Sequence, residues 1–159
     1  MTTIVFRDGI LAADGRITHN DTIVGDNFTK IHVLADGGAV AMCGRPDECV
    51  PIIEWLKVVA AGEQAGPQPD VESSTLLHID GDGVVRVLND RYWIEIEEPY
   101  FAAGSGATAA LGALHAGASA IEAVAAAIKT DPYSGGQVRA VTLQNLVPKK
   151  TRKPKPADS

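Results

Sequence analysis

Short apolar runs separated by glycine-containing turns are the feature that most constrains the fold of this 159-residue chain. Three turn signals share an Asp-Gly step, and they lie at residues 7–9, 35–38 and 80–83. The runs that flank them, which we predict to be strands, are residues 3–6 and 10–13, 30–34 and 39–43, and 74–79 and 84–88. An Asp-Gly turn between two such runs predicts a β-hairpin. A chain whose strands come in hairpins builds mostly antiparallel sheets.

Three segments carry helix signals. Asp47 is placed to cap a helix over residues 47–61, and Gly62 follows as a stop signal. A second helix is expected over residues 107–116, after Gly104-Ser105-Gly106. A third is expected over residues 119–129, where Ser119 and Glu122 have the spacing of a capping box.

The order of the predicted elements gives the fold class. Further strands are expected over residues 92–97, 100–103 and 137–143. Strands in hairpins, then one helix, more strands, two helices and a last strand favour helices packed outside antiparallel sheets. We therefore predict an α+β fold, a four-layer αββα sandwich of mostly antiparallel sheets.

Charge divides the chain into an acidic body and a basic end. The formal net charge is −6, yet five of the 14 Lys/Arg and one of the 20 Asp/Glu lie in residues 149–159. Residues 1–148 then hold nine basic and nineteen acidic side chains, which offers no basic face to nucleic acid. We predict one domain over residues 2–147 and a disordered basic Pro/Lys tail over residues 148–159. Contact of this tail with an acidic partner is the alternative.

The sequence gives no sign of a membrane segment or of secretion. No apolar run approaches the roughly 18 residues that span a bilayer, and the first residues lack the pattern of a signal peptide. Cys43 and Cys49 are the two cysteines, and without clustered His they do not form a zinc-ligand pattern. We predict a cytoplasmic protein, in which these thiols stay reduced.

Removal of Met1 would make Thr2 a candidate nucleophile. The residue would then carry a free α-amine beside its own hydroxyl. The hydroxyl can attack a carbonyl carbon while the amine accepts the proton, directly or through a water. An α-amine suits this role because its reference pKa of about 7.7–8.0 is close to neutral.

Further polar residues follow Thr2 in a specific order. They are Asp14 after the second predicted strand, Lys30 at the third, Ser105 before a helix, and Asp131 and Ser134 in a turn. Each alone has an ordinary structural reading, as a turn residue, a solvated cation or a helix start. Together with the opening Thr-Thr-Ile-Val, the sixteen-residue step from Asp14 to Lys30, Gly-Ser-Gly and Tyr-Ser-Gly-Gly, the set resembles the proteasome β-subunit family of N-terminal nucleophile (Ntn) hydrolases. It is most similar to the HslV type, and the resemblance covers residues 2–143.

The resemblance implies roles for these residues. Thr2 would be the nucleophile, and Lys30 would lie beside its hydroxyl and stabilise developing negative charge. Asp14 would pair with Lys30. Ser105, Asp131 and Ser134 would hydrogen-bond around the Thr2 amine. Gly44 would supply the oxyanion-hole N–H, and Met42 would line a pocket for a medium-sized apolar side chain.

The function that the resemblance implies is a threonine-type peptidase inside a homo-oligomeric double ring, with an ATPase unfoldase as a candidate partner that would feed it. Its substrate would be a peptide or unfolded protein, with no nucleic acid or membrane partner. Peptide hydrolysis would need no cofactor, while a structural monovalent or divalent cation is considered near the turn at residues 130–136. Two alternatives stay open: a catalytically silent ring-forming protein of the same fold, and a small-molecule Ntn amidase. Retention of Met1 would block the Thr2 amine.

Overall fold

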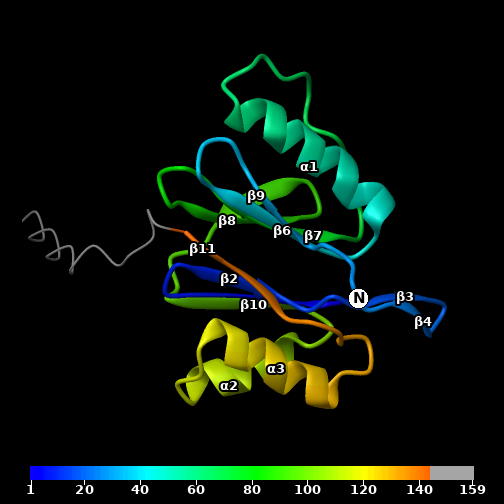
Figure 1. Ribbon diagram of the computed structural model, residues 1–159. Helices are drawn as coiled ribbons and strands as arrows, with labels where there is room; N and C mark the ends of the chain where they lie inside the picture. Colours follow the sequence, from blue (N-terminus) through cyan, green and yellow to red (C-terminus); the bar gives the residue numbers. More distant parts are fainter. Residues whose placement is uncertain (144–159) are drawn as a thin grey trace, which may run out of the picture.

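Two antiparallel sheets form the centre of the structure (Figure 1), a computed structural model that describes residues 1–143. The first sheet has the strand order β10-β1-β2-β11, and the second has the order β5-β6-β7-β8-β9. A separate hairpin joins β3 and β4. The strands are β1 (Thr3–Arg7), β2 (Ile10–Ala13), β3 (Ile17–His19), β4 (Thr22–Gly25), β5 (Ile31–Val33), β6 (Ala39–Cys43), β7 (Thr75–Ile79), β8 (Val85–Asn89), β9 (Tyr92–Glu95), β10 (Tyr100–Gly104) and β11 (Arg139–Thr142).

The three helices within residues 1–143 lie on the outer faces of these sheets. Helix α1 (Pro46–Ala60) lies over the five-stranded sheet, and α2 (Ala107–His115) and α3 (Ala120–Thr130) lie together on the far face of the four-stranded sheet (Figure 1). None of the helices in residues 1–143 is long and apolar enough to cross a membrane. The predicted mixture of helices with mostly antiparallel sheets is confirmed.

Within the described residues, three buried apolar clusters fill the spaces between these layers. One lies between the two sheets, with Ile4 and Leu77 from opposite sheets both fully buried. A second joins the five-stranded sheet to α1, and the third joins the four-stranded sheet to α2 and α3. The third is rich in alanine, including Ala110 and Ala123, so the helices can approach the sheet closely.

The hairpin β1–β2 brings distant polar residues to one end of the four-stranded sheet. Asp8 and Gly9 form its turn with φ angles of 52° and 75°, a conformation that glycine and aspartate tolerate best. Arg7 pairs with Ile10 and Ile4 pairs with Ala13. Residues 2 and 14 therefore leave the sheet at the same end, opposite the turn.

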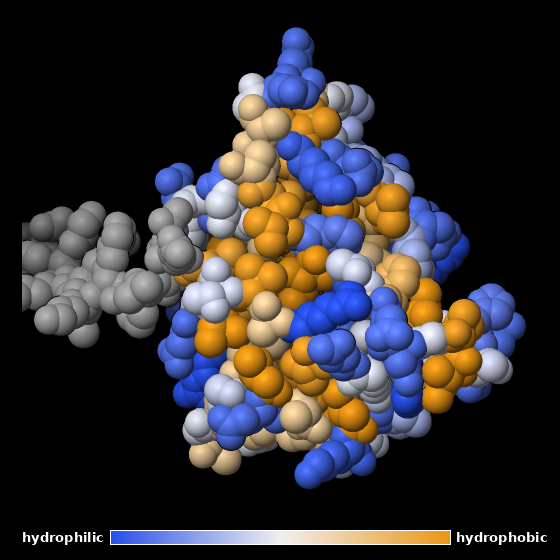
Figure 2. Space-filling model, viewed as in Figure 1, coloured by the Kyte–Doolittle hydropathy of each residue, from blue (hydrophilic) through white to orange (hydrophobic). Residues whose placement is uncertain are grey.

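The hairpin β3–β4 was not expected from the sequence. Its strands are short and mostly exposed, and they turn at Asn20 and Asp21, whose φ angles are 46° and 62°. The hairpin projects from the body of the molecule (Figure 1). Figure 2 shows apolar side chains on it, where Ile23 and Val24 are exposed. The sequence predicted two successive hairpins in the first 44 residues, and the structure has three there.

One predicted cap is wrong. Helix α1 begins at Pro46, its N-cap residue is Arg45 and no side chain caps it. Asp47 lies inside the first turn and binds Arg45 instead, with an Arg45 Nη2 to Asp47 Oδ2 distance of 2.5 Å. Pro46 suits the first position of the helix, because its missing N–H would have no helical partner there. The capping box of Ser119 and Glu122 is confirmed.

The other predicted boundaries differ from the observed ones by a few residues at most. The runs 10–13 and 39–43 coincide with β2 and β6. The predicted strands 92–97 and 137–143 are longer than the observed β9 and β11. The predicted tail, residues 148–159, and the last four residues of the predicted domain lie outside the described residues.

Candidate active site

A buried group of three side chains lies at the end of the four-stranded sheet. The hydroxyl of Thr2 hydrogen-bonds to Asp14 Oδ1 and accepts a hydrogen bond from Lys30 Nζ. Lys30 Nζ also reaches Asp14 Oδ1 at 2.8 Å. The exposed fractions of Thr2, Asp14 and Lys30 are 2%, 1% and 5%. A largely buried hydroxyl is thus held between a carboxylate and an amine.

The local fold explains how three residues spread over 28 positions of the chain meet. Thr2 immediately precedes β1 and Asp14 immediately follows β2, its hairpin partner. Lys30 immediately precedes β5. Its carbonyl accepts the N–H of Met42 at 3.0 Å, which fixes it beside β6. Contacts between β1 and β6 and between β2 and β5 bring the two sheets together at this point.

Burial changes the acid–base properties of Lys30. Loss of hydration lowers the pKa of its amine, whereas attraction to Asp14 opposes that change. An ammonium group in this position therefore depends on Asp14 as its counter-charge. An arrangement of this kind raises the acidity of a neighbouring hydroxyl, since it stabilises the oxyanion that forms.

Backbone groups hold the carboxylate of Asp14 in place. Its Oδ1 accepts the N–H of Thr3 at 3.0 Å. Its Oδ2 accepts the N–H of Arg16 at 3.2 Å and that of Gly135 at 2.9 Å. Hydrogen bonds to a charged carboxylate are stronger than those to a neutral acceptor. Asp14 is therefore fixed from three segments of the chain.

A second polar network lies beside the first. Asp131 Oδ2 accepts hydrogen bonds from the hydroxyls of Ser105 and Ser134, each at 2.6 Å. Burial alone would raise the pKa of Asp131, but the hydrogen bonds from Ser105, Ser134 and the Tyr133 N–H, with attraction to the N-terminal ammonium, together outweigh it and lower the pKa. The hydroxyl of Ser134 also lies 2.7 Å from that of Thr3.

The structure places this second network differently from the simple expectation. Ser105 reaches the Thr2 carbonyl oxygen at 3.4 Å. Ser134 contacts the Thr3 hydroxyl rather than an atom of Thr2. The backbone nitrogen of Thr2 forms an amide with Met1 in this chain. The three predicted residues are therefore brought together, and they connect to Thr2 through its carbonyl and through Thr3.

Arg16 is a site residue that sequence reasoning missed. Its guanidinium forms two hydrogen bonds with Asp26, at 2.8 Å and 3.2 Å, and a third with the Pro132 carbonyl at 3.1 Å. Hydrogen bonding to Asp26 raises the pKa of Arg16. A Cβ added to Gly135 would approach this guanidinium to 2.4 Å. Arg16 thus joins the loop after β2, the loop before β5 and the turn after α3.

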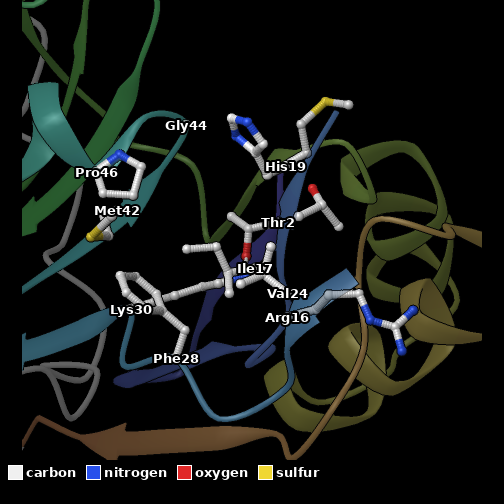
Figure 3. Close-up of a pocket in the computed structure, with 12 residues that line it drawn as sticks. Thr2, Arg16, Ile17, His19, Val24, Phe28, Lys30, Met42, Gly44 and Pro46 are labelled. Carbon is white, nitrogen blue, oxygen red and sulfur yellow. Dashed lines mark hydrogen bonds between the residues drawn. The ribbon is translucent and has the colours of Figure 1, made fainter. Parts of the chain in front are cut away.

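A cavity opens beside the Thr2 hydroxyl (Figure 3). Its volume is about 410 Å³, and it is lined by the predicted residues Met42 and Gly44 together with residues of β3 and β4. Figure 3 shows Lys30 pointing toward Thr2, with Met42 on the wall of the cavity. Gly44 has a φ of +125°, and an added Cβ would lie 2.5 Å from the Ser74 hydroxyl, so only glycine fits here without strain.

A second cavity of about 690 Å³ continues from the first. Residues that line both include Thr18, His19, Gly44 and Pro46. The two spaces therefore adjoin at these residues, and Thr2 lines the first of them. Within residues 1–143 no group of three or more His, Cys, Asp or Glu side chains is placed to hold a metal ion. A cation held by other ligands near residues 130–136 stays a prediction.

Comparisons with known proteins show what the chain is similar to. It is 27% identical to "Proteasome subunit beta 2" of Pyrococcus abyssi, over 88% of this chain and 84% of that protein. A solved structure of Thiobacillus denitrificans BPH shares 20% identity and superposes with a TM-score of 0.64, over 89% of this chain and 97% of that one. No family model matches. The sequence likeness supports a proteasome-like family, and the structural likeness shows a shared fold.

Proposed function

We propose that this protein is a threonine-type Ntn peptidase of the proteasome-like class, with Thr2 as nucleophile. One observation carries the proposal: the Thr2 hydroxyl, at the edge of a cavity, is hydrogen-bonded to both Asp14 and Lys30. Polar side chains this deeply buried are costly unless they are paired. The likeness to a proteasome β subunit supports the same conclusion. The four-layer Ntn-hydrolase assignment is part of this proposal.

The proposal requires cleavage of the bond between Met1 and Thr2. That step converts an amide nitrogen, which is not basic, into an α-amine with a reference pKa of about 7.7–8.0. The new amine would lie beside the Thr2 hydroxyl and near Asp131. The Ser105 hydroxyl is already placed at the Thr2 carbonyl, 3.4 Å away, where it can hold the new terminus.

The reaction would run in two steps. The Thr2 hydroxyl attacks the peptide carbonyl, and its proton passes to the α-amine. The tetrahedral intermediate collapses to an acyl-enzyme, and the leaving amine takes that proton. Water then attacks the ester, again with the α-amine as base, and releases the acid and free Thr2. Lys30, held by Asp14, stabilises the developing charge on the Thr2 oxygen in both steps.

Gly44 is the residue that we propose for the oxyanion hole. It immediately follows β6 and lies at the wall of both cavities, and its lack of a side chain lets a substrate backbone approach. Met42, two residues earlier, is 4% exposed and contributes to the apolar wall. A medium-sized apolar side chain is the substrate group that this wall favours.

We further propose that the enzyme works inside a homo-oligomeric ring that an ATPase unfoldase supplies with peptides or unfolded protein. Two adjoining cavities support an extended substrate over a compact one. This is the reason to favour a peptidase over a small-molecule amidase. The proteasome-like HslV type, a cytoplasmic location and a cation near residues 130–136 belong to the same proposal.

Covalent labelling tests the nucleophile directly. The purified protein is incubated with a peptide vinyl sulfone or epoxyketone, and its intact mass is measured. We expect loss of the Met1 mass and gain of one inhibitor per chain at Thr2. The matched control is Thr108→Ala, which removes an exposed threonine hydroxyl on α2 and keeps the Thr2 hydroxyl.

Two results would contradict the proposal. A chain that retains Met1 and stays unlabelled, yet assembles, would favour the catalytically silent ring protein. Labelling of Thr2 without any hydrolysis of peptides, combined with a monomeric particle, would favour an amidase that acts on small molecules.

A further inference from the structure

The strand β9 forms one edge of the five-stranded sheet. Among the strands of residues 1–143 it bonds only to β8, with Tyr92 opposite Asn89 and Ile94 opposite Val87. The N–H of Ile96 continues this series and donates to the Val85 carbonyl at 2.9 Å. Antiparallel pairs alternate between bonded and non-bonded positions. Trp93 and Glu95 therefore direct their backbone N–H and C=O groups toward the open edge.

The side chains of β9 are unusual for an edge strand. Tyr92 is 75% exposed and Ile94 is 55% exposed, on the face of the sheet opposite Trp93. Charged residues flank them, because Arg91 precedes the strand and Glu95 ends it. Natural sheets usually protect an open edge with lysine, proline or a bulge. Exposed apolar side chains on such an edge indicate a partner strand.

We propose that β9 pairs with β9 of a second copy of this chain, antiparallel and about a two-fold axis at Trp93. This register sets Trp93 opposite the partner's Trp93, so that their free backbone groups can form a bonded pair. Tyr92 then lies opposite the partner's Ile94, in the closer non-bonded position. Arg91 lies opposite the partner's Glu95, and by symmetry each of these contacts occurs twice.

Other registers fail on at least one of these requirements. A two-fold axis at Tyr92 or Ile94 would pair backbone groups that are already bonded to β8. An axis at Glu95 would set Glu95 against the partner's Glu95, and like charges in opposing positions destabilise a sheet. The register at Trp93 satisfies backbone, apolar side chains and charges together. That self-complementarity is why a second copy, rather than an unrelated peptide, is the occupant.

The proposal concerns assembly and is independent of catalysis by Thr2. Joining two copies would extend each five-stranded sheet into one of ten strands, with both α1 helices on the same side. It goes beyond the proposed ring, because a two-fold contact pairs identical surfaces whereas a ring contact joins different ones. A failed labelling experiment would leave it standing.

Charge exchange tests the register. Arg91→Glu sets Glu against the partner's Glu95, and Glu95→Arg sets Arg against the partner's Arg91. Each single variant should weaken the two-fold contact at least about tenfold, seen as a smaller particle in sedimentation velocity. A mixture of the two single variants should restore the wild-type mass, because both cross-pairs are then Glu with Arg. The double variant should do the same alone.

Controls separate this contact from general charge effects. Glu98→Arg makes the same charge change beyond the strand and should leave the particle unchanged. Cysteines test proximity: Tyr92→Cys mixed with Ile94→Cys should crosslink under mild oxidation faster than either variant alone, since opposed Cα atoms lie about 4.5 Å apart. A monomeric wild type, single variants of unchanged mass, or a mixture that fails both to reassemble and to crosslink would overturn the proposal.

Discussion

Two ion pairs of equal length differ completely in their surroundings. Lys30 and Asp14 are 2.8 Å apart, with side chains 5% and 0% exposed. Arg86 and Asp80 are also 2.8 Å apart, but their side chains are 34% and 22% exposed. A partly exposed pair keeps much of its hydration, whereas a buried pair loses it and depends on its own contacts. Distance alone therefore says nothing of what a pair does.

The two pairs also differ in what they support. Asp80 accepts the N–H groups of Asp82 at 2.9 Å and Val84 at 3.0 Å, so it stabilises the β7–β8 turn. This role in the turn is sufficient to explain the pair of Arg86 and Asp80. Asp14 fixes backbone as well, yet Lys30 adds a hydrogen bond to the Thr2 hydroxyl. Burying a cation costs hydration that its contacts must offset, and this cost is one reason for the chemical role that we propose for the pair.

The largest effect should come from the nucleophile itself. We expect Thr2→Ala to reduce peptide hydrolysis and covalent labelling to background, because no other group supplies the attacking oxygen. Thr2→Ser should retain part of the activity, since hydroxyl and amine both survive. Initial rates on a fluorogenic peptide measure both, and thermal melting verifies the fold. Hydrolysis by Thr2→Ala near the wild-type rate would refute the mechanism.

Replacement of the two cations should separate the two pairs by activity. We expect Lys30→Ala to lower kcat/KM by about 10²–10³, the usual effect of removing one preorganised electrostatic group. Lys30→Arg should not restore it, because a planar guanidinium does not fit the place of a compact ammonium. Arg86→Ala should change kcat/KM less than about twofold. Similar losses of kcat/KM in Lys30→Ala and Arg86→Ala would contradict the proposed difference between the two ion pairs.

Loss of the two carboxylates should separate the pairs by stability. Asp14→Ala leaves Lys30 as an uncompensated buried cation, which typically costs about 3–5 kcal/mol in free energy of unfolding. Asp80→Ala loses two turn hydrogen bonds and a partly exposed ion pair, together about 1–2 kcal/mol. Urea unfolding followed by circular dichroism measures both values. An Asp14→Ala variant as stable as Asp80→Ala would mean that Lys30 finds water or another anion.

Much of the fold could be predicted because its turns are local. Asp8-Gly9 encodes the positive φ angles of the first hairpin, and the runs 10–13 and 39–43 match β2 and β6. The β3–β4 hairpin escaped because its strands are short, partly polar and exposed, so they leave no alternation of apolar residues. Its turn residues Asn20 and Asp21 were the available signal.

The candidate site was predictable only in part. Thr2, Asp14 and Lys30 could be singled out by order and chemistry, and the structure places them in contact. The parts played by Arg16 and Thr3 could not be, because they depend on contacts with residues more than 100 positions away, at Pro132 and Ser134. Such contacts arise from tertiary packing and leave no local pattern.

The pH dependence of activity should reveal the state of Lys30. The proposed mechanism needs the charged ammonium, and burial lowers its pKa below the ordinary value. Activity should therefore be present below that lowered pKa and disappear as the pH rises through it, before a solvated lysine would titrate. The acid limb should follow the α-amine. A pH profile of kcat/KM measures both limbs, and Arg86→Ala is the control that should leave them in place. An alkaline limb at or above about 10.4, the reference value of lysine, would contradict the proposed environment of Lys30.

The smallest effect should come from Arg86, the partly exposed cation. We expect Arg86→Gln to lower the free energy of unfolding by less than about 1 kcal/mol, as is usual for exposed ion pairs. The difference from wild type should shrink further at about 1 M NaCl, where the Debye length falls to about 3 Å. Thermal melting at two salt concentrations measures it. The loss caused by Asp14→Ala should persist at high salt, because buried charges are screened much less. If both losses faded equally with salt, water would have access to Lys30, and the buried site would resemble the surface pair after all.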